Sequence, residues 1–312
     1  MNFQHAGPLA ETASALANAT KRLPRHSVYR SLAARREYLE AYDRVVGRLN
    51  MPVRGVDVST RYGHTHLLLG GKREAKPILL LPGMSICAPM MLEFFEYLAD
   101  TRLLIAPDLV GQPGLSADTP FDPRDQAYGK WLLDVLDELG IDKIDMIGPS
   151  FGGSIALDLA AIAPERVGRL ALITTAGVTP HIPIVTAFAP LFVTWLAYRV
   201  FPHRPWLEPI ARRMCRNWSP RNLDYLDLVI RTTAYWRHRP AGPFKAGQFK
   251  ETIDPVFIAF SGRDHLLPFE PTFEHAHKAL PIAKEMVMPL AAHMPSAEDI
   301  APVEPELRKF FA

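Results

Sequence analysis

Ser150 lies between two glycines in the segment Ile-Gly-Pro-Ser-Phe-Gly-Gly, which spans residues 147–153. An apolar run precedes this segment and a helix-like stretch follows it, so Gly148, Ser150 and Gly152 form a G-x-S-x-G pattern at a strand-to-helix turn. Such a turn is crowded, and the positions beside the serine must lack side chains. The pattern predicts that Ser150 is a nucleophile. The alternative is a serine that only occupies a turn.

A serine hydroxyl is a weak nucleophile at neutral pH, so it needs a base and an acid that orients the base. Asp264 follows the apolar run Val-Phe-Ile-Ala-Phe, and His293 follows the run that ends at Pro289. Both residues come just after predicted strands, in the order serine, acid, histidine. Asp254 is a poorer candidate for the acid of the triad, because it precedes its strand and would lie at the other end of the sheet. We therefore predict a catalytic triad of Ser150, Asp264 and His293.

Attack of a serine on a carbonyl produces an oxyanion, which requires N–H donors. One predicted donor is the backbone of Phe151, directly after the nucleophile. The other is the backbone of Met84, in the loop that follows the apolar run Leu-Leu-Leu-Pro-Gly. The predicted oxyanion hole therefore consists of Met84 and Phe151.

Short apolar runs alternate with helix-like segments over most of the chain, which is typical of a parallel sheet covered on both faces. The predicted strands lie at 53–60, 65–71, 77–83, 102–108, 142–150, 166–175, 255–268 and 284–293. The predicted helices lie within 1–50 and at 124–140, 151–163 and 270–280, with a final helix from about 297. We predict a helical extension at 1–50, an α/β core at 51–177 and 246–312, and a helical cap at 178–245.

The segment 178–245 interrupts the alternation and holds four of the five tryptophans. Residues 178–250 contain eleven Lys and Arg against three Asp and Glu, a formal charge of +8 within a chain of net charge +2. This charge either attracts an anionic substrate or is an ordinary solvated surface. Aromatic side chains of the cap either form its own small core or line an apolar substrate pocket; the pocket candidates are Phe188, Phe192, Trp195, Trp218 and Trp236.

The composition argues against several classes of protein. A net charge of +2 does not indicate a nucleic-acid partner, and two cysteines indicate neither a disulfide framework nor a metal cluster. The N-terminus lacks the pattern of a secretory signal, and the apolar stretch 184–200 is interrupted by Pro190 and Arg199. We expect a cytoplasmic protein without an integral membrane span. The helix within 1–50 packs on the main domain or, alternatively, makes the contact of a homodimer.

With these motifs in place, the chain resembles the α/β-hydrolase superfamily and, within it, bacterial carboxylesterase-like serine hydrolases. The resemblance covers about 55–312, and its matching segments are 79–85, 106–116, 131–153, 164–167, 261–264 and His293. It implies a mostly parallel eight-stranded sheet with a helical cap inserted after the sixth strand. One departure concerns the oxyanion loop, where the family usually has His-Gly and this chain has Pro82-Gly83. We expect Pro82 to brace the loop by its rigidity.

The predicted reaction is hydrolysis of a carboxylic ester through an acyl-enzyme, with a small, partly apolar substrate and no cofactor or metal. Haloalkane dehalogenases and epoxide hydrolases of this fold use an aspartate as the nucleophile. Ser150 at that position argues against both classes. Three alternatives stay open on sequence grounds. The same triad could serve a thioesterase or acyltransferase, it could cleave a carbon–carbon bond, or the fold could act as a ligand receptor without turnover.

Overall fold

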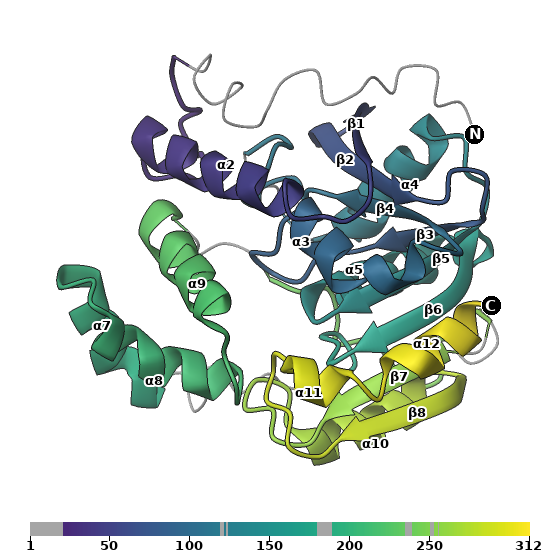
Figure 1. The fold of residues 1–312 in the computed structure, drawn as a ribbon. Coiled ribbons are helices and arrows are strands. Elements are labelled where there is room, and N and C mark those ends of the chain that lie inside the picture. The colour runs from purple at the N-terminus through teal and green to yellow at the C-terminus, as the bar shows by residue number, and fades with distance from the viewer. Residues whose placement is uncertain are drawn as a thin grey trace.

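The computed structural model describes residues 21–118, 122, 124–179, 189–234, 239–249, 253, 254 and 256–312. Its centre is a single sheet of eight strands in the order β1-β2-β4-β3-β5-β6-β7-β8 (Figure 1). The strands are β1 (Val53–Thr60), β2 (Gly63–Gly71), β3 (Pro77–Leu80), β4 (Leu103–Pro107), β5 (Ile144–Pro149), β6 (Val167–Ile173), β7 (Val256–Ser261) and β8 (Ile282–Met288). β2 pairs antiparallel with β1 and β4, and all other neighbours are parallel. The predicted fold class is confirmed.

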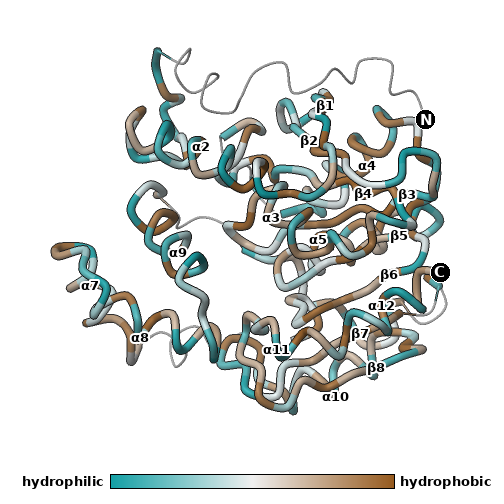
Figure 2. The backbone as a smooth tube through the Cα atoms, in the orientation of Figure 1, coloured by the Kyte–Doolittle hydropathy of each residue, from teal (hydrophilic) through white to brown (hydrophobic). Residues whose placement is uncertain are grey.

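The central strands are buried on both faces, which explains their unbroken apolar runs. β3 is buried along its whole length, and its side chains alternate between two cores. Leu79 packs in one core, whereas Ile78 and Leu80 pack in the other. The hydrophobic residues accordingly concentrate along the strands in the middle of the molecule (Figure 2).

Helices cover both faces of the sheet. Residues of α4 (Ala127–Glu138), α5 (Phe151–Ile162) and α10 (Phe269–Ala279) pack in the core that contains Leu79. The other core receives residues of α2 (Leu32–Val46), α3 (Ala88–Phe94), α9 (Pro220–Thr232) and α12 (Glu304–Phe311). The remaining described helices are α7 (Phe192–Val200), α8 (Arg204–Met214) and α11 (Ala297–Ile300), with 3-10 turns at Glu96–Leu98, Pro164–Arg166 and Ala189–Leu191.

The final helix predicted from about 297 is two helices. Ser296 caps the first of them, because its hydroxyl accepts a hydrogen bond from the Asp299 N–H and the Asp299 carboxylate accepts one from the Ser296 N–H. α11 ends at Ile300, and Pro302 separates it from α12. Proline lacks an N–H and cannot continue a helix interior, which accounts for the break.

A buried ion pair ties the N-terminal ends of the parallel strands to the C-terminal helix. The Arg102 guanidinium lies 2.5 Å from the Asp145 carboxylate and also donates to the carbonyls of Pro77 and Phe311. Burial alone would raise the pKa of Asp145. The hydrogen bonds from Arg102 and the Arg169 N–H outweigh burial and hold that pKa below its usual value.

α7, α8 and α9 lie between β6 and β7 in the chain, where the helical cap is predicted, and extend to one side of the sheet (Figure 1). The N-terminal segment packs against them as well as against the sheet. Tyr29 forms an isolated β-bridge with Thr233, and the Arg30 side chain donates to the Thr233 carbonyl at 2.7 Å. The division into extension, core and cap at 50, 177 and 245 stays a prediction.

Candidate active site

Ser150 occupies the junction between β5 and α5 with φ 48° and ψ −115°. Residues other than glycine seldom adopt positive φ, so the surrounding structure must hold this conformation. The Ser150 N–H donates to the Ile173 carbonyl at 2.9 Å, and its carbonyl accepts from the Ala176 N–H at 3.0 Å. Both partners lie at or just after the end of β6. The neighbouring strand therefore clamps the strained serine.

The glycines around Ser150 are required by close backbone contacts. A Cβ atom on Gly148 would lie 2.5 Å from the Gly153 Cα, and one on Gly152 would lie 2.1 Å from the Leu81 carbonyl oxygen. Real Cβ contacts are essentially never below 3.0 Å, so an alanine at either position would displace main chain. The G-x-S-x-G spacing is thus a steric condition for packing β5, α5 and the loop after β3 together.

The structure brings the three residues of the predicted triad together. Ser150 Oγ lies 2.8 Å from His293 Nε2, and His293 Nδ1 lies 2.8 Å from Asp264 Oδ2. A carboxylate only accepts hydrogen bonds, so Nδ1 carries the ring proton and Nε2 is left to accept the Ser150 proton. The side chains of Asp264 and His293 are 2% and 10% exposed. Water therefore competes little for their hydrogen bond.

The loops that carry the acid and the histidine are joined to each other. The Gly262 N–H donates to the Met288 carbonyl, and the Arg263 N–H donates to the Ala291 carbonyl, both at 2.9 Å. Asp264 Oδ1 accepts from the N–H groups of its own loop, at Leu266 and Leu267. Each carboxylate oxygen thus has a defined task, one holding the loop and the other facing His293.

The two predicted oxyanion donors belong to two segments that lie next to the nucleophile. Phe151 is the first residue of α5, and the N–H groups of the first helical turn have no acceptor within the helix. Met84 lies in a turn whose Gly83 is near the serine, since a Cβ on Gly83 would be 3.9 Å from the Ser150 Cβ. Among the described residues, the Met84 N–H has no hydrogen-bond acceptor. The positive end of the α5 dipole favours an anion at the same place.

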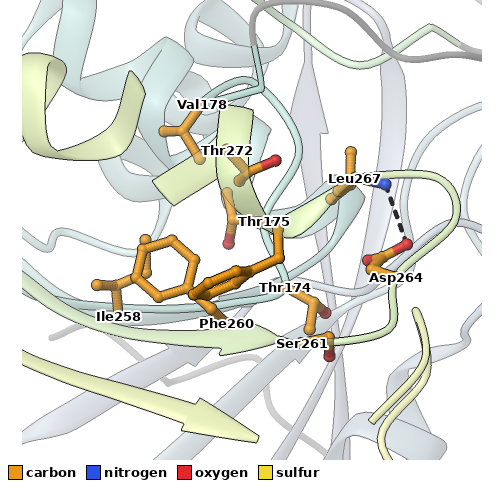
Figure 3. A pocket seen from close by; sticks show the side chains of 10 residues that line it. Thr174, Thr175, Val178, Ile258, Phe260, Ser261, Asp264, Leu267 and Thr272 are labelled. Carbon is orange, nitrogen blue, oxygen red and sulfur yellow. Dashed lines mark hydrogen bonds between the residues drawn. The ribbon is translucent and has the colours of Figure 1, made fainter. Parts of the chain in front are cut away.

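A cavity of about 10 Å³ has Asp264 in its lining. Figure 3 shows the side chains around it. It is lined by Thr174, Thr175, Val178, Ile258, Phe260, Ser261, Asp264, Leu267, Phe269 and Thr272. This volume holds about one water molecule and no substrate. A substrate must therefore approach Ser150 from elsewhere.

The predicted pocket residues have mixed positions. Phe188 and Trp236 lie outside the described residues. Phe192 and Trp195 on α7 stack on each other with ring centroids 6.1 Å apart, and Phe192 is 59% exposed. Trp218 lies half-buried just before α9. Their assignment to a substrate pocket stays a prediction.

Asp108 and Asp254 are two carboxylates outside the triad. Asp108 is fully buried and accepts hydrogen bonds from the N–H groups of Ala88 and Leu115, so it holds the start of α3 and the loop after β4. Burial raises the pKa of Asp108. Asp254 is exposed and lies 2.9 Å from Lys143 Nζ. The carboxylate that bonds to His293 is that of Asp264, not that of Asp108 or Asp254.

Sequence reasoning missed the side chains that hold the turn after β3. The Ser85 N–H donates to Gln112 Oε1 at 2.8 Å, and the Ser85 carbonyl accepts from the Tyr225 hydroxyl of α9. Tyr225 is 140 residues away in the chain. No local sequence pattern predicts such a contact. The sequence indicates only the rigidity of Pro82 as support for this loop.

Metal sites and membrane spans are two other features that the described ranges could contain. Within these ranges, no group of three or more His, Cys, Asp and Glu is arranged to hold a metal ion. None of the described helices has both the length and the apolar character needed to cross a membrane.

Comparison with known proteins places these features in context. A family model described as the alpha/beta hydrolase fold matches residues 76–299. The chain is 30% identical over 139 residues to an uncharacterized carboxylesterase, nap, of Bacillus subtilis, which is 45% of this chain and 46% of that protein. It is 44% identical over 103 residues to a 2-hydroxymuconate semialdehyde hydrolase of a Pseudomonas species, which is 31% of this chain and 34% of that protein.

Solved structures resemble a larger part of the chain. The crystal structure of naproxen esterase from Bacillus subtilis has a TM-score of 0.74 and 21% identity, over 88% of this chain and 97% of that one. This likeness concerns the fold. The sequence match to nap spans less than half the length of that carboxylesterase.

Proposed function

Because this chain belongs to the α/β-hydrolase family, we propose that it is a serine hydrolase that cleaves a carboxylic ester of a small, partly apolar molecule. The observation that carries the proposal is the hydrogen-bonded series Ser150–His293–Asp264, which starts from a strained serine at the end of β5. The name of the similar Bacillus subtilis protein nap, a carboxylesterase, supports the ester as the bond that is cleaved.

In the proposed first step, His293 Nε2 takes the Ser150 proton while Oγ bonds to the ester carbonyl carbon. The carbonyl oxygen becomes an oxyanion, which accepts hydrogen bonds from the N–H groups of Phe151 and Met84. When this intermediate collapses, the carbon–oxygen bond to the alcohol breaks and His293 returns the proton to the leaving alkoxide.

The second half of the reaction repeats these steps with water in place of Ser150. His293 takes a proton from the water, whose oxygen attacks the acyl carbon. Collapse releases the acid, and Ser150 recovers its proton from His293. Asp264 stays ionised and stabilises the imidazolium in both halves.

Hydrolysis of p-nitrophenyl esters from acetyl to long acyl chains tests the proposal. We expect turnover by the wild type, and loss of several orders of magnitude in kcat for Ser150→Ala. A fluorophosphonate probe should label the peptide that contains Ser150. Ser59→Ala, which changes an exposed serine on β1, is the matched control and should keep both turnover and labelling. Equal turnover by wild type and Ser150→Ala would refute the assignment.

Cleavage of a carbon–carbon bond is the second candidate. The match to the semialdehyde hydrolase covers 103 residues at 44% identity, which is higher than the 30% of the match to nap. The same triad would then act on a vinylogous diketone. Comparing kcat/KM for such a diketone with the best p-nitrophenyl ester separates the two. If kcat/KM favours the diketone by orders of magnitude, carbon–carbon bond cleavage would take the place of ester hydrolysis as the proposed reaction.

A further inference from the structure

The turn that carries Met84 has an unusual residue at its strained position. The Ile86 N–H donates to the Gly83 carbonyl at 3.1 Å, which closes a four-residue β-turn. Ser85 has φ 67°, whereas Met84 is not among the described residues with positive φ. Positive φ at the third position alone defines a type II turn, where glycine is the usual residue. A serine there needs outside support.

Side chains from two distant elements supply that support. A type II turn becomes a type I turn when its central peptide, here Met84–Ser85, rotates by about half a turn. Gln112 fixes this peptide because its Oε1 accepts the Ser85 N–H at 2.8 Å. Tyr225 fixes the next peptide because its hydroxyl donates to the Ser85 carbonyl. The turn is thus held from the loop after β4 and from α9.

The N-terminal helix extends this support. The Tyr38 hydroxyl of α2 lies 2.7 Å from the Tyr225 hydroxyl. Tyr225 has one hydroxyl proton, which goes to the Ser85 carbonyl, so Tyr38 is the donor in the bond between the two tyrosines. A hydroxyl that accepts a hydrogen bond is a stronger donor in turn. Tyr38 is 1% exposed, so water does not compete for the bond, and the other acceptor of its hydroxyl, the Pro113 carbonyl, is farther away at 3.5 Å.

We propose that Tyr225, with Tyr38 behind it, is a positioning residue that keeps the Met84 N–H aimed at the oxyanion. The Gly83–Met84 peptide is planar, and its carbonyl accepts the Ile86 N–H, so the turn itself sets the direction of the Met84 N–H. The hydrogen bond from Tyr225 to the Ser85 carbonyl holds the turn as a whole in place, and with it the Met84 N–H. Oxyanion donors act within a few tenths of an ångström. The role of Tyr225 rests on the proposed function, and it gives the N-terminal helix a part in the reaction.

Tyr225→Phe removes the hydroxyl and little else. We expect kcat to fall about tenfold, less than the 10²- to 10³-fold of a deleted oxyanion donor, with KM within about twofold of wild type. The inhibition constant of a trifluoromethyl ketone, which forms an oxyanion on Ser150, should rise by the same factor as kcat/KM falls. Tyr38→Phe should change both quantities in the same direction by a smaller factor.

Tyr198→Phe is the matched control, because it also removes a tyrosine hydroxyl from the helical insertion. The Tyr198 hydroxyl bonds to Asp227 and not to Ser85. It should keep wild-type kcat and inhibitor affinity. Unchanged kcat and inhibitor affinity in Tyr225→Phe would overturn the proposal, and so would a rise in KM alone. If Tyr225→Phe does not fold, Tyr38→Phe decides by the same measurements. Failure of the proposed function differs, since the wild type itself would then show neither turnover nor labelling of Ser150.

Discussion

Replacement of Asp264 by asparagine tests both roles of the acid, which orients His293 and carries the charge that stabilises its imidazolium. Oδ1 accepts the N–H groups of Leu266 and Leu267 at 2.7 and 3.0 Å, and Oδ2 faces His293 Nδ1 at 2.8 Å. The asparagine must keep its oxygen at the Oδ1 position, because the opposite orientation would set an NH₂ group against two N–H donors. Its NH₂ group therefore donates to Nδ1. The ring proton of His293 moves to Nε2, where it can no longer accept the proton of Ser150.

The variant also loses the charge that stabilises the imidazolium. At 2.8 Å and an effective dielectric constant of about 20, the attraction between the two charges is about 6 kcal/mol. The desolvation cost of a buried pair offsets part of this energy. Each 1.36 kcal/mol changes the rate about tenfold, so we expect kcat to fall roughly 10³- to 10⁴-fold. The same substitution in the serine protease triad has a similar effect, about 10⁴-fold.

The assay is steady-state hydrolysis of the best p-nitrophenyl ester, with thermal unfolding to show that the variant is folded. Asp254→Asn is the control, because Asp254 is exposed and pairs with Lys143; it should keep wild-type kcat. A folded Asp264→Asn variant with kcat within about tenfold of wild type would refute the assignment of Asp264.

Further predictions concern stability. Gly152→Ala should cost more than about 3 kcal/mol or abolish soluble expression, because its Cβ would lie 2.1 Å from the Leu81 oxygen; Gly47→Ala, with ordinary contacts, should unfold at the wild-type urea concentration. Asp145→Asn should cost about 3 kcal/mol at pH 7, since it leaves Arg102 buried without its counter-ion. The pKa of Asp145 is lower in the folded chain, so its stabilisation is present above its unfolded pKa of about 4 and is lost as pH falls below it. Urea titrations at pH 7 and at low pH should show the difference from wild type shrinking, and a constant difference contradicts this reasoning.

The residues of the site could be predicted because parallel strands bring their carboxyl ends to one edge. Ser150, Asp264 and His293 each follow a strand, so their neighbourhood follows from strand order without any knowledge of side-chain contacts. The close packing behind Gly152 is likewise visible in the motif. Both cases depend on a local pattern that recurs at the same point of each strand–loop unit.

Other features depend on contacts between distant residues and left no local pattern. α3 begins at Ala88, whose N–H is held by the buried Asp108 from another loop. The support of Ser85 by Tyr225 joins a core turn to the helical insertion. The exposure of Phe192 on α7 also differs from what an apolar segment suggests, because a run of apolar residues does not tell which neighbours will cover it.

β6 and β7 are neighbours in the sheet, yet roughly 80 residues separate the end of one at Ile173 from the start of the other at Val256. The entropy of closing a loop grows only with the logarithm of its length, by about 0.6 kcal/mol for each doubling. Relative to a ten-residue connection, this insertion therefore costs the sheet only about 2 kcal/mol. Natural variation can lengthen, shorten or replace the insertion while the strands keep their register, so the two parts of the chain are free to evolve at different rates.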